Sequence, residues 1–383
     1  MLIYLDNAAT TYPKPIAVSN SACQAVKLYG ANPGRSGHNM SIRTAEEIFK
    51  CRQAIKNMFN ADSEENIVFT LNCTHAINTV LKGYLKPGDH VVISSLEHNA
   101  VVRPLAELAK HGITYSVAPV IFNDNDATVD SFRRAINAST RLIACTHASN
   151  VWGARLPVER LTALAHQYGI RIMVDAAQTA GIFPVDLQND RIDFLCMAGH
   201  KGLYGTMGTG VLITSCGDKL GTIIEGGTGT SSQSQEQPSY MPEKFESGTP
   251  NVPGIIALKS GVEFVMNRHP ENIANHEMKL ILRLYDRLSE NKNVKLYTPR
   301  PSLQYFAPVL SFNIKNTESE AVADYLNKNG QIAVRAGLHC APLAHESVGT
   351  SDIGAVRISP SIFNNSYEID RLSNLIQKIR INL

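Results

Sequence analysis

Two short motifs carry the residue types best suited to chemistry, and each follows an apolar run of strand length. Residues 175–178 read Asp-Ala-Ala-Gln, and residues 198–201 read Ala-Gly-His-Lys. Ligands in open α/β sheets bind beyond the carboxyl ends of the strands, so both motifs point into one crevice. A lysine for a Schiff base and an acid for a pyridinium nitrogen are what pyridoxal phosphate requires. Taken alone, Asp175 could be a helix cap and Lys201 a solvated surface charge, but together they indicate this cofactor.

The phosphate of such a cofactor needs backbone N–H groups at a helix N-terminus, together with hydroxyl groups. Residues 71–75 (Leu-Asn-Cys-Thr-His) follow a strand expected at 66–70 and open a helix expected at 76–85, which is the required geometry. Thr74 could also cap that helix, and the two roles are compatible. The glycines after Lys201 lack a Gly-Lys-Ser/Thr ending, so we interpret them as a turn that brings backbone close to Lys201.

The elements that position these motifs alternate between short apolar runs and helical stretches. The pattern predicts strands at 66–70, 90–94, 141–146, 171–175, 192–197 and 210–214, and helices at 99–111, 129–137 and 158–168. The strands are nearly continuous in Val, Ile, Leu and Phe, as a sheet covered on both faces requires. The alternation favours a mainly parallel α/β sheet, and an irregular α+β layer is the alternative.

A segment rich in Gly, Thr, Ser, Gln and Pro at 221–254 separates this part from a second one, and long loops of this kind are often functional. Beyond it, the pattern predicts helices at 254–267 and 271–289, strands at 308–314, 332–335 and 356–359, and a last helix from about Tyr367. A length of 383 residues also suits two domains better than one. We therefore expect a large cofactor-binding domain at 15–250 and a smaller α+β domain formed by 1–14 and 251–383.

Composition excludes several classes of protein. Hydrophobic residues make up 44% and charged residues 18%, which is typical of a globular chain rather than a disordered one. The formal charge is only +2 and no basic block occurs, which argues against nucleic acid as a partner. The apolar runs are too short to cross a membrane, and the first residues do not resemble a signal peptide. Seven scattered cysteines without a C-x-x-C pair indicate a reducing cytoplasm.

In this order, the motifs resemble those of the class V aminotransferase family of pyridoxal-phosphate enzymes. The resemblance covers essentially the whole chain through the segments 4–11, 32–38, 97–100, 147–153, 175–178 and 200–201. Residues 335–341 (Arg-Ala-Gly-Leu-His-Cys-Ala) are similar to the R-x-G-x-H-C-A signature of the second group of cysteine desulfurases and selenocysteine lyases. The resemblance implies fold type I, with a mainly parallel seven-stranded sheet in the large domain.

The resemblance also implies which residues hold the cofactor. Lys201 would bond it and then act as the base on the substrate, and Asp175 would pair with the ring nitrogen. His98 would stack on the ring and could move protons. Asn150 and Gln178 would hydrogen-bond the phenolic oxygen, with Asn150 also near the substrate. The implied phosphate ligands are Thr74, His75, His200 and Thr249.

Thr249 matches the family residue that reaches the phosphate of the partner subunit, which implies a homodimer with shared active sites. Arg357 matches the family's arginine that binds the substrate carboxylate. The planar fork of an arginine can pair with both carboxylate oxygens. Apolar residues surround Arg357 in the sequence, which argues against an exposed charge at a strand edge. Arg335 is the next candidate for the carboxylate.

Cys340 is the cysteine with the most reactive surroundings, because Arg335 and His339 are near it in the sequence and a nearby cation favours the thiolate. The alternatives are a small packing residue, as we interpret Cys73, or a zinc site with His339 and His345, which lacks a clear fourth ligand.

The expected reaction converts L-cysteine to L-alanine and leaves a persulfide on Cys340, with L-selenocysteine as a further expected substrate and a sulfur- or selenium-acceptor protein as a partner. A class V transaminase or lyase that does not use Cys340, and a persulfide carrier, are the alternatives. Two positions depart from the family pattern: Ala198 stands where relatives have Ser, and Leu338 where the signature often has His.

Overall fold

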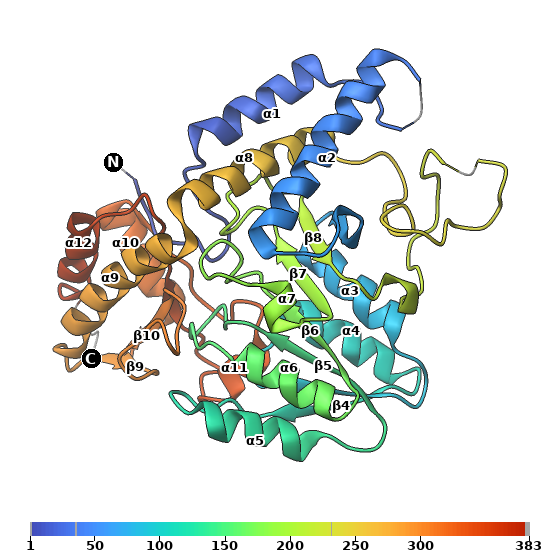
Figure 1. Cartoon of the computed structure of the whole chain (residues 1–383). Helices are drawn as coiled ribbons and strands as arrows, with labels where there is room; N and C mark the ends of the chain where they lie inside the picture. The colour runs from blue at the N-terminus through green and yellow to red at the C-terminus, as the bar shows by residue number, and fades with distance from the viewer. Residues whose placement is uncertain (1, 35–36, 231, 380–383) are drawn as a thin grey trace.

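A seven-stranded sheet forms the centre of the computed structural model, which describes residues 2–34, 37–230 and 232–379 (Figure 1). Arg35 and Ser36 of the motif at 32–38, and Ser231 of the long loop, lie outside the described residues. The strand order is β2-β8-β7-β6-β5-β3-β4. The strands are β2 (Ile67–Thr70), β3 (His90–Ser94), β4 (Thr114–Ala118), β5 (Thr140–Thr146), β6 (Arg171–Asp175), β7 (Phe194–Ala198) and β8 (Gly210–Ile213).

The sheet is mainly parallel, as the alternating pattern predicts. Strands β7, β6, β5, β3 and β4 pair in parallel, whereas β8 is antiparallel to both of its neighbours, β7 and β2. All six predicted strands are present within two residues of their expected ends. Strand β4 was not predicted, because it lies at an edge of the sheet, exposes much of its length and so lacks a continuous apolar run.

Helices cover both faces of the sheet, because successive strand side chains point to opposite faces. Val91 and Ile93 pack in one hydrophobic cluster with α3 (Cys73–Tyr84) and α4 (Asn99–Ala109). Val92, between them, packs in another cluster with α5 (Asn125–Ala135) and α6 (Val158–Gln167). This two-sided burial explains why polar residues in the predicted strands lie mostly at the ends of the strands.

Helix α8 (Val252–Arg268) lies side by side with α1 (Ile16–Leu28) and α2 (Asn39–Phe59) at the top of Figure 1. The helices α1 and α2 were not predicted, and exposed apolar residues such as Ile16 and Val26 blur the pattern of α1. Because α8 packs across the boundary expected at residue 251, the division into units of 15–250 and of 1–14 with 251–383 stays a prediction.

The C-terminal part of the chain has an α+β arrangement. Strands β9 (Val294–Leu296), β10 (Leu310–Ile314) and β12 (Val356–Ile358) form an antiparallel sheet in the order β12-β10-β9. The nearby helices are α9 (Pro270–Ser289), α10 (Ser319–Gly330) and α12 (Ser366–Ile376). The N-terminal strand β1 (Ile3–Tyr4) pairs in parallel with β11 (Ile332–Ala333), and this pairing brings Asp6 beside β12.

The short elements that remain are the helices α7 (Leu187–Asp190) and α11 (Pro342–Glu346) and the 3₁₀ turns η1 (Glu64–Asn66) and η2 (Gly217–Lys219). Between η2 and α8 the described residues form neither helix nor strand, in agreement with the loop predicted at 221–254. Within the described ranges, no helix is long and apolar enough to cross a membrane.

Candidate active site

A cavity of about 230 Å³ contains most of the predicted site residues. It lies beyond the carboxyl ends of β5, β6 and β7, where the two sequence motifs were expected to meet. The predicted residues that line it are Thr74, His98, Asn150, Asp175, Gln178, His200, Lys201, Arg335 and Arg357. His75 and Thr249 instead line another cavity of about 280 Å³, which Leu71 of the turn before α3 also lines.

Asp175, the last residue of β6, is 4% exposed. Its Oδ1 accepts hydrogen bonds from the backbone N–H of Ala177 at 2.9 Å and from the thiol of Cys73 at 3.4 Å. Burial raises the pKa of Cys73 well above its ordinary value, so Cys73 remains a thiol that donates. No described residue hydrogen-bonds Oδ2, which leaves one carboxylate oxygen for a ligand. Cys73 therefore does more than pack.

Lys201 lies three residues beyond the end of β7. The turn that holds it requires glycine at the next position, Gly202. A Cβ on Gly202 would lie 2.3 Å from the carbonyl oxygen of Ala180. Burial lowers the pKa of Lys201, and Asp175 opposes this shift. A lysine amine with a lowered pKa is more often neutral, and the neutral amine is the form that acts as a nucleophile or takes a proton. The turn inferred from the glycines is thus present.

His98 caps α4 with its ring. Its Nδ1 accepts a hydrogen bond from the backbone N–H of Ala100 at 3.0 Å. Burial lowers the pKa of His98, with Asp175 opposing the shift, so the imidazole favours its neutral form. Because Nδ1 is an acceptor, the single proton of the neutral ring is on Nε2.

The turn before α3 presents the helix N-terminus to the cavity. Asn72 is the N-cap, and its Oδ1 accepts from the backbone N–H of His75 at 2.9 Å. The interpretation of Thr74 as the cap is therefore wrong, and among the described residues nothing hydrogen-bonds its hydroxyl, which can bind a ligand. The adjacent strand passes very close, because a Cβ on Gly210 would lie 2.4 Å from the carbonyl carbon of Asn72. Both features agree with a phosphate site.

His200 also lines the cavity, and the pKa of its imidazole is strongly lowered. Burial, followed by the charge of Lys201, lowers the pKa of His200 to about 4. Its Nδ1 is buried and has no hydrogen-bond partner among the described residues. A buried ring nitrogen normally has a partner, so this atom is suited to bind a ligand. Ala198, at the end of β7, supplies no hydroxyl here.

Arg357 is 1% exposed, which excludes a charge on the surface. Its Nη2 forms an ion pair with Oδ1 of Asp6 at 2.6 Å, and its Nη1 donates to the carbonyl of Asn150 at 2.9 Å. Within the part of the chain that the structure describes, the buried Nε has no partner. The guanidinium thus retains donors for an anion in the cavity.

The amides of Asn150 and Gln178 are partly used within the chain. Asn150 Nδ2 donates to the carbonyl of His339 at 2.7 Å, and Gln178 Nε2 donates to the carbonyl of Ala8 at 3.1 Å. An amide nitrogen carries two N–H groups, so one on each side chain remains for an acceptor.

Cys340 is exposed on the loop between β11 and α11. Arg335 Nη2 lies 3.8 Å from the sulfur of Cys340. The backbone carbonyl of Cys340 accepts a hydrogen bond from the backbone N–H of Asn99 at 2.7 Å. His339 and Cys340 have φ angles of 49° and 57°, so two successive residues adopt the left-handed conformation that disfavours side chains. The loop is therefore held in an uncommon conformation beside the start of α4.

The zinc alternative finds no support in the geometry. His345 Nδ1 hydrogen-bonds the hydroxyl of Thr350 at 2.8 Å, and His339 Nε2 donates to the carbonyl of Ala355 at 2.9 Å. Over residues 2–34, 37–230 and 232–379, no group of three His, Cys, Asp or Glu side chains could hold a metal ion.

Glu97, the residue before His98, was given no role in the predictions from the sequence. It is completely buried beside His98, and its Oε1 accepts from the backbone N–H of Thr146 at 2.8 Å and from the hydroxyl of Ser94. Burial raises the pKa of Glu97 to about 8. The carboxyl group ties the residue before His98 to the end of β5. In the sequence, the only sign of a role for Glu97 is its position next to His98, shortly after the end of a strand.

Comparisons with known proteins agree with the resemblance seen in the sequence. The family model described as Aminotransferase class-V matches residues 3–372. A relative from Methanothermobacter thermautotrophicus, named probable cysteine desulfurase, is 33% identical over 98% of this chain and 94% of its own length. A relative from Escherichia coli O8, named cysteine desulfurase, is 33% identical over 99% of this chain and 93% of its own length.

Among solved structures, the apo structure of a cysteine desulfurase from Thermococcus onnurineus NA1 matches with a TM-score of 0.90 at 30% identity. The match covers 98% of this chain and 94% of that protein. A structure named NifS-like protein matches with a TM-score of 0.84 at 25% identity, over 98% of this chain and 99% of that one. The fold class predicted from the sequence is thereby confirmed.

The raised pKa of Glu97 predicts a pH-dependent contribution to stability. Between the ordinary value of 4.5 and about 8, the folded chain holds a proton on Glu97 that the unfolded chain releases. The free energy of unfolding should therefore fall as pH rises through this range. Glu97→Gln should lose this slope, so that its stability relative to the parent rises by ~1 kcal/mol or more from pH 5 to pH 8. Urea titrations at several pH values measure the free energy of unfolding of both proteins. If it changes with pH in the same way in the parent and in Glu97→Gln, Glu97 is ionised in the folded chain.

Proposed function

This chain belongs to the class V aminotransferase family, and we propose on this premise that it is a pyridoxal-phosphate-dependent cysteine desulfurase. It converts L-cysteine to L-alanine and leaves a persulfide on Cys340. The observation that carries the proposal is the exposed Cys340 thiol, whose neighbour His339 and whose contact Arg335 both line the cavity that contains Lys201 and Asp175. A transaminase would have no need of a thiol at this place.

The donors and acceptors of the cavity fit pyridoxal phosphate. Asp175 Oδ2 can accept from a pyridinium nitrogen, and Lys201 supplies the amine. The N-terminus of α3 with Thr74, together with the unpartnered Nδ1 of His200, provides a site for the phosphate. When bound, the cofactor withdraws electrons from the α-carbon of the substrate.

Residues of this chain bind the substrate and transfer its protons. Arg357 binds the substrate carboxylate with the donors that Asp6 and Asn150 leave free, and Arg335 is close enough to assist. Lys201, with its lowered pKa, takes the proton from the α-carbon. His98, neutral and held at the start of α4, would lie against the ring of the bound cofactor and can move a proton from Nε2.

Cys340 performs the sulfur transfer. Its thiolate attacks the sulfur of the substrate, an S–S bond forms, and the C–S bond breaks with its electron pair left on carbon. A proton then completes alanine, and Cys340 carries the persulfide. The guanidinium Nη2 of Arg335 lies 3.8 Å from the sulfur of Cys340. An exposed persulfide can pass its sulfur to an acceptor protein.

Selenocysteine is a second proposed substrate. Its C–Se bond is weaker than a C–S bond, so selenium can leave with less reliance on Cys340. Leu338 stands where the group signature often has His and is exposed beside the Cys340 loop, so it could alter the preference between sulfur and selenium.

We also propose a homodimer in the cytoplasm, in which Thr249 reaches the phosphate of the partner subunit. Thr249 lies in the loop before α8 and its hydroxyl is 3.4 Å from the amide of Asn32. Exposed apolar side chains lie along the cavities on both sides of this loop, and such patches mark interfaces. They are Ile42, Phe49, Leu71 and Ile224.

Replacement of Cys340 tests the proposed function most directly. Cys340→Ala should abolish alanine formation from L-cysteine, because no other sulfur accepts the leaving atom, and should keep the absorbance of bound cofactor. Cys23→Ala, a change at another exposed cysteine, should leave the rate unchanged. Alanine release and the mass of the Cys340 peptide after cysteine treatment are measured. Full activity in Cys340→Ala, with no added sulfur on the parent peptide, would favour the transaminase or lyase alternative. Residual activity on selenocysteine alone would indicate a selenocysteine lyase.

Arg357→Ala should raise the KM for L-cysteine by about tenfold to a hundredfold, because a hydrogen bond to a charged group contributes about 1.5–3 kcal/mol. Arg357→Lys should recover only part of this loss, since an ammonium cannot pair with both carboxylate oxygens. Steady-state kinetics measure the effect, and thermal unfolding identifies variants that are merely unstable. An unchanged KM would instead assign the carboxylate to Arg335.

Mixed dimers test the shared site. A Lys201→Ala subunit and a Thr249→Ala subunit should each be inactive or weak alone, yet their mixture should recover part of the activity. One of the two sites then combines an intact Lys201 with an intact Thr249 from the partner. Activity is assayed after exchange of subunits. A chain that sediments as a monomer at assay concentration would remove Thr249 from the site.

A further inference from the structure

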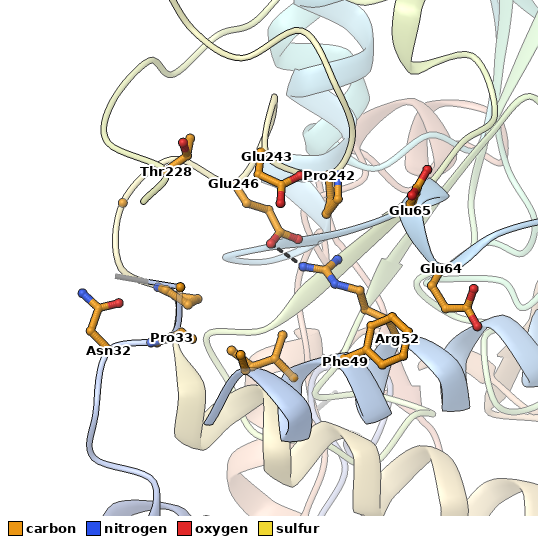
Figure 2. Close-up of a pocket in the computed structure, with 15 residues that line it drawn as sticks. Asn32, Pro33, Phe49, Arg52, Glu64, Glu65, Thr228, Pro242, Glu243 and Glu246 are labelled. Carbon is orange, nitrogen blue, oxygen red and sulfur yellow. Dashed lines mark hydrogen bonds and ion pairs between the residues drawn. The ribbon is translucent and has the colours of Figure 1, made fainter. Parts of the chain in front are cut away.

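Arg52 on α2 and Glu246 in the loop before α8 form an ion pair at 2.5 Å, on the wall of a cavity of about 360 Å³ (Figure 2). The side chains are only 9% and 18% exposed. A pair this deeply buried is stable only when its remaining donors and acceptors are also satisfied. The partners that satisfy them are therefore informative.

Those partners belong to β2, which is an edge strand of the central sheet. Arg52 Nη1 donates to the carbonyl of Ile67, and Glu246 Oε1 accepts from the backbone N–H of Phe69 at 2.6 Å. Residues two apart in a strand direct their polar groups to the same side. The ion pair therefore lies where a further strand would pair with β2. It hydrogen-bonds two backbone groups of an edge that would otherwise be open. The guanidinium also lies over the ring of Phe69, 4.6 Å from its centre.

The same ion pair is connected to both proposed phosphate-binding segments. Strand β2 ends at Thr70 and leads directly into the turn that presents Thr74 and the N-terminus of α3. Glu246 precedes Thr249 by three residues in a loop without helix or strand. Gly248, between them, is held by a hydrogen bond from its N–H to the carbonyl of Gly227 at 2.9 Å.

We propose that Arg52 is a positioning residue that couples the two active sites of the dimer. Through β2 it fixes the phosphate turn of its own subunit, and through Glu246 it fixes the Thr249 segment that serves the partner. This inference rests on the proposed shared site. Its consequence is that loss of one guanidinium weakens cofactor binding in both sites, although Arg52 touches neither.

Heterodimers with one functional lysine separate the two effects. When one subunit carries Lys201→Ala, only the other can form the absorbance of lysine-bound pyridoxal phosphate. Arg52→Met in the subunit with the intact lysine then reports on that subunit's own phosphate turn. Arg52→Met in the Lys201→Ala subunit reports on the Thr249 segment that reaches across. In each arrangement we expect the apparent Kd of pyridoxal phosphate, followed by this absorbance, to rise at least fivefold.

Matched variants exclude a general loss of stability. Lys50→Met removes an ion pair with Glu47 from the same helix, but Lys50 is 52% exposed, so it should leave the Kd unchanged. Arg52→Lys keeps the charge without the fork and should recover only part of the affinity. If Arg52→Met does not give soluble dimers, Glu246→Gln is measured in the same arrangements, with the same expected direction.

The outcomes are distinguishable from a failure of the proposed function. Thr249→Ala in the Lys201→Ala subunit tests the shared site itself. If this change raises the Kd while Arg52→Met in that subunit does not, the coupling is overturned and the shared site stands. If Thr249→Ala has no effect across the dimer, or if no dimer forms, the shared site is wrong and the coupling is overturned with it. An unchanged Kd with Arg52→Met in both arrangements would remove Arg52 from any positioning role.

Discussion

The buried guanidinium of Arg357 is the constraint around which the cavity is assembled. Removing such a charge from water costs several kcal/mol unless partners surround it. Asp6 supplies the opposite charge from the N-terminal segment, and the carbonyl of Asn150 supplies an acceptor from the loop after β5. Neither partner is near Arg357 in sequence, so satisfying this charge requires the N-terminus, the central sheet and β12 to meet at one point.

The same desolvation sets the protonation of the other groups in the cavity. It lowers the pKa of Lys201, His98 and His200 and raises that of Glu97. The bases of the site thus favour their neutral forms, while His200 Nδ1 and Arg357 Nε have no hydrogen-bond partner among the described residues. A site with this distribution is prepared for an anionic ligand and for proton transfer, because the protein rather than water already surrounds the reacting groups.

Burial and neighbouring groups distinguish the cysteine that can react with the substrate. Cys51, Cys73, Cys145 and Cys196 are buried, and burial raises the pKa of each thiol. Cys340 is exposed beside Arg335 on a loop that a hydrogen bond to Asn99 attaches to α4. An accessible thiol next to a cation and next to the cavity suits both steps of the proposed reaction, the attack on the substrate sulfur and the transfer to an acceptor.

The sequence by itself determined the buried strands, the motifs at their carboxyl ends and the family, because these depend on local apolar runs and on short groups of residues. It did not determine β4, whose exposed edge has no apolar run, or Asn72 as the helix cap in place of Thr74. Only the tertiary structure decided that Asp6 pairs with Arg357 and that Glu246 closes the edge of β2, because the contacts join residues 351 and 177 positions apart. The role of Glu97 likewise follows from burial, which no local pattern around an acidic residue specifies.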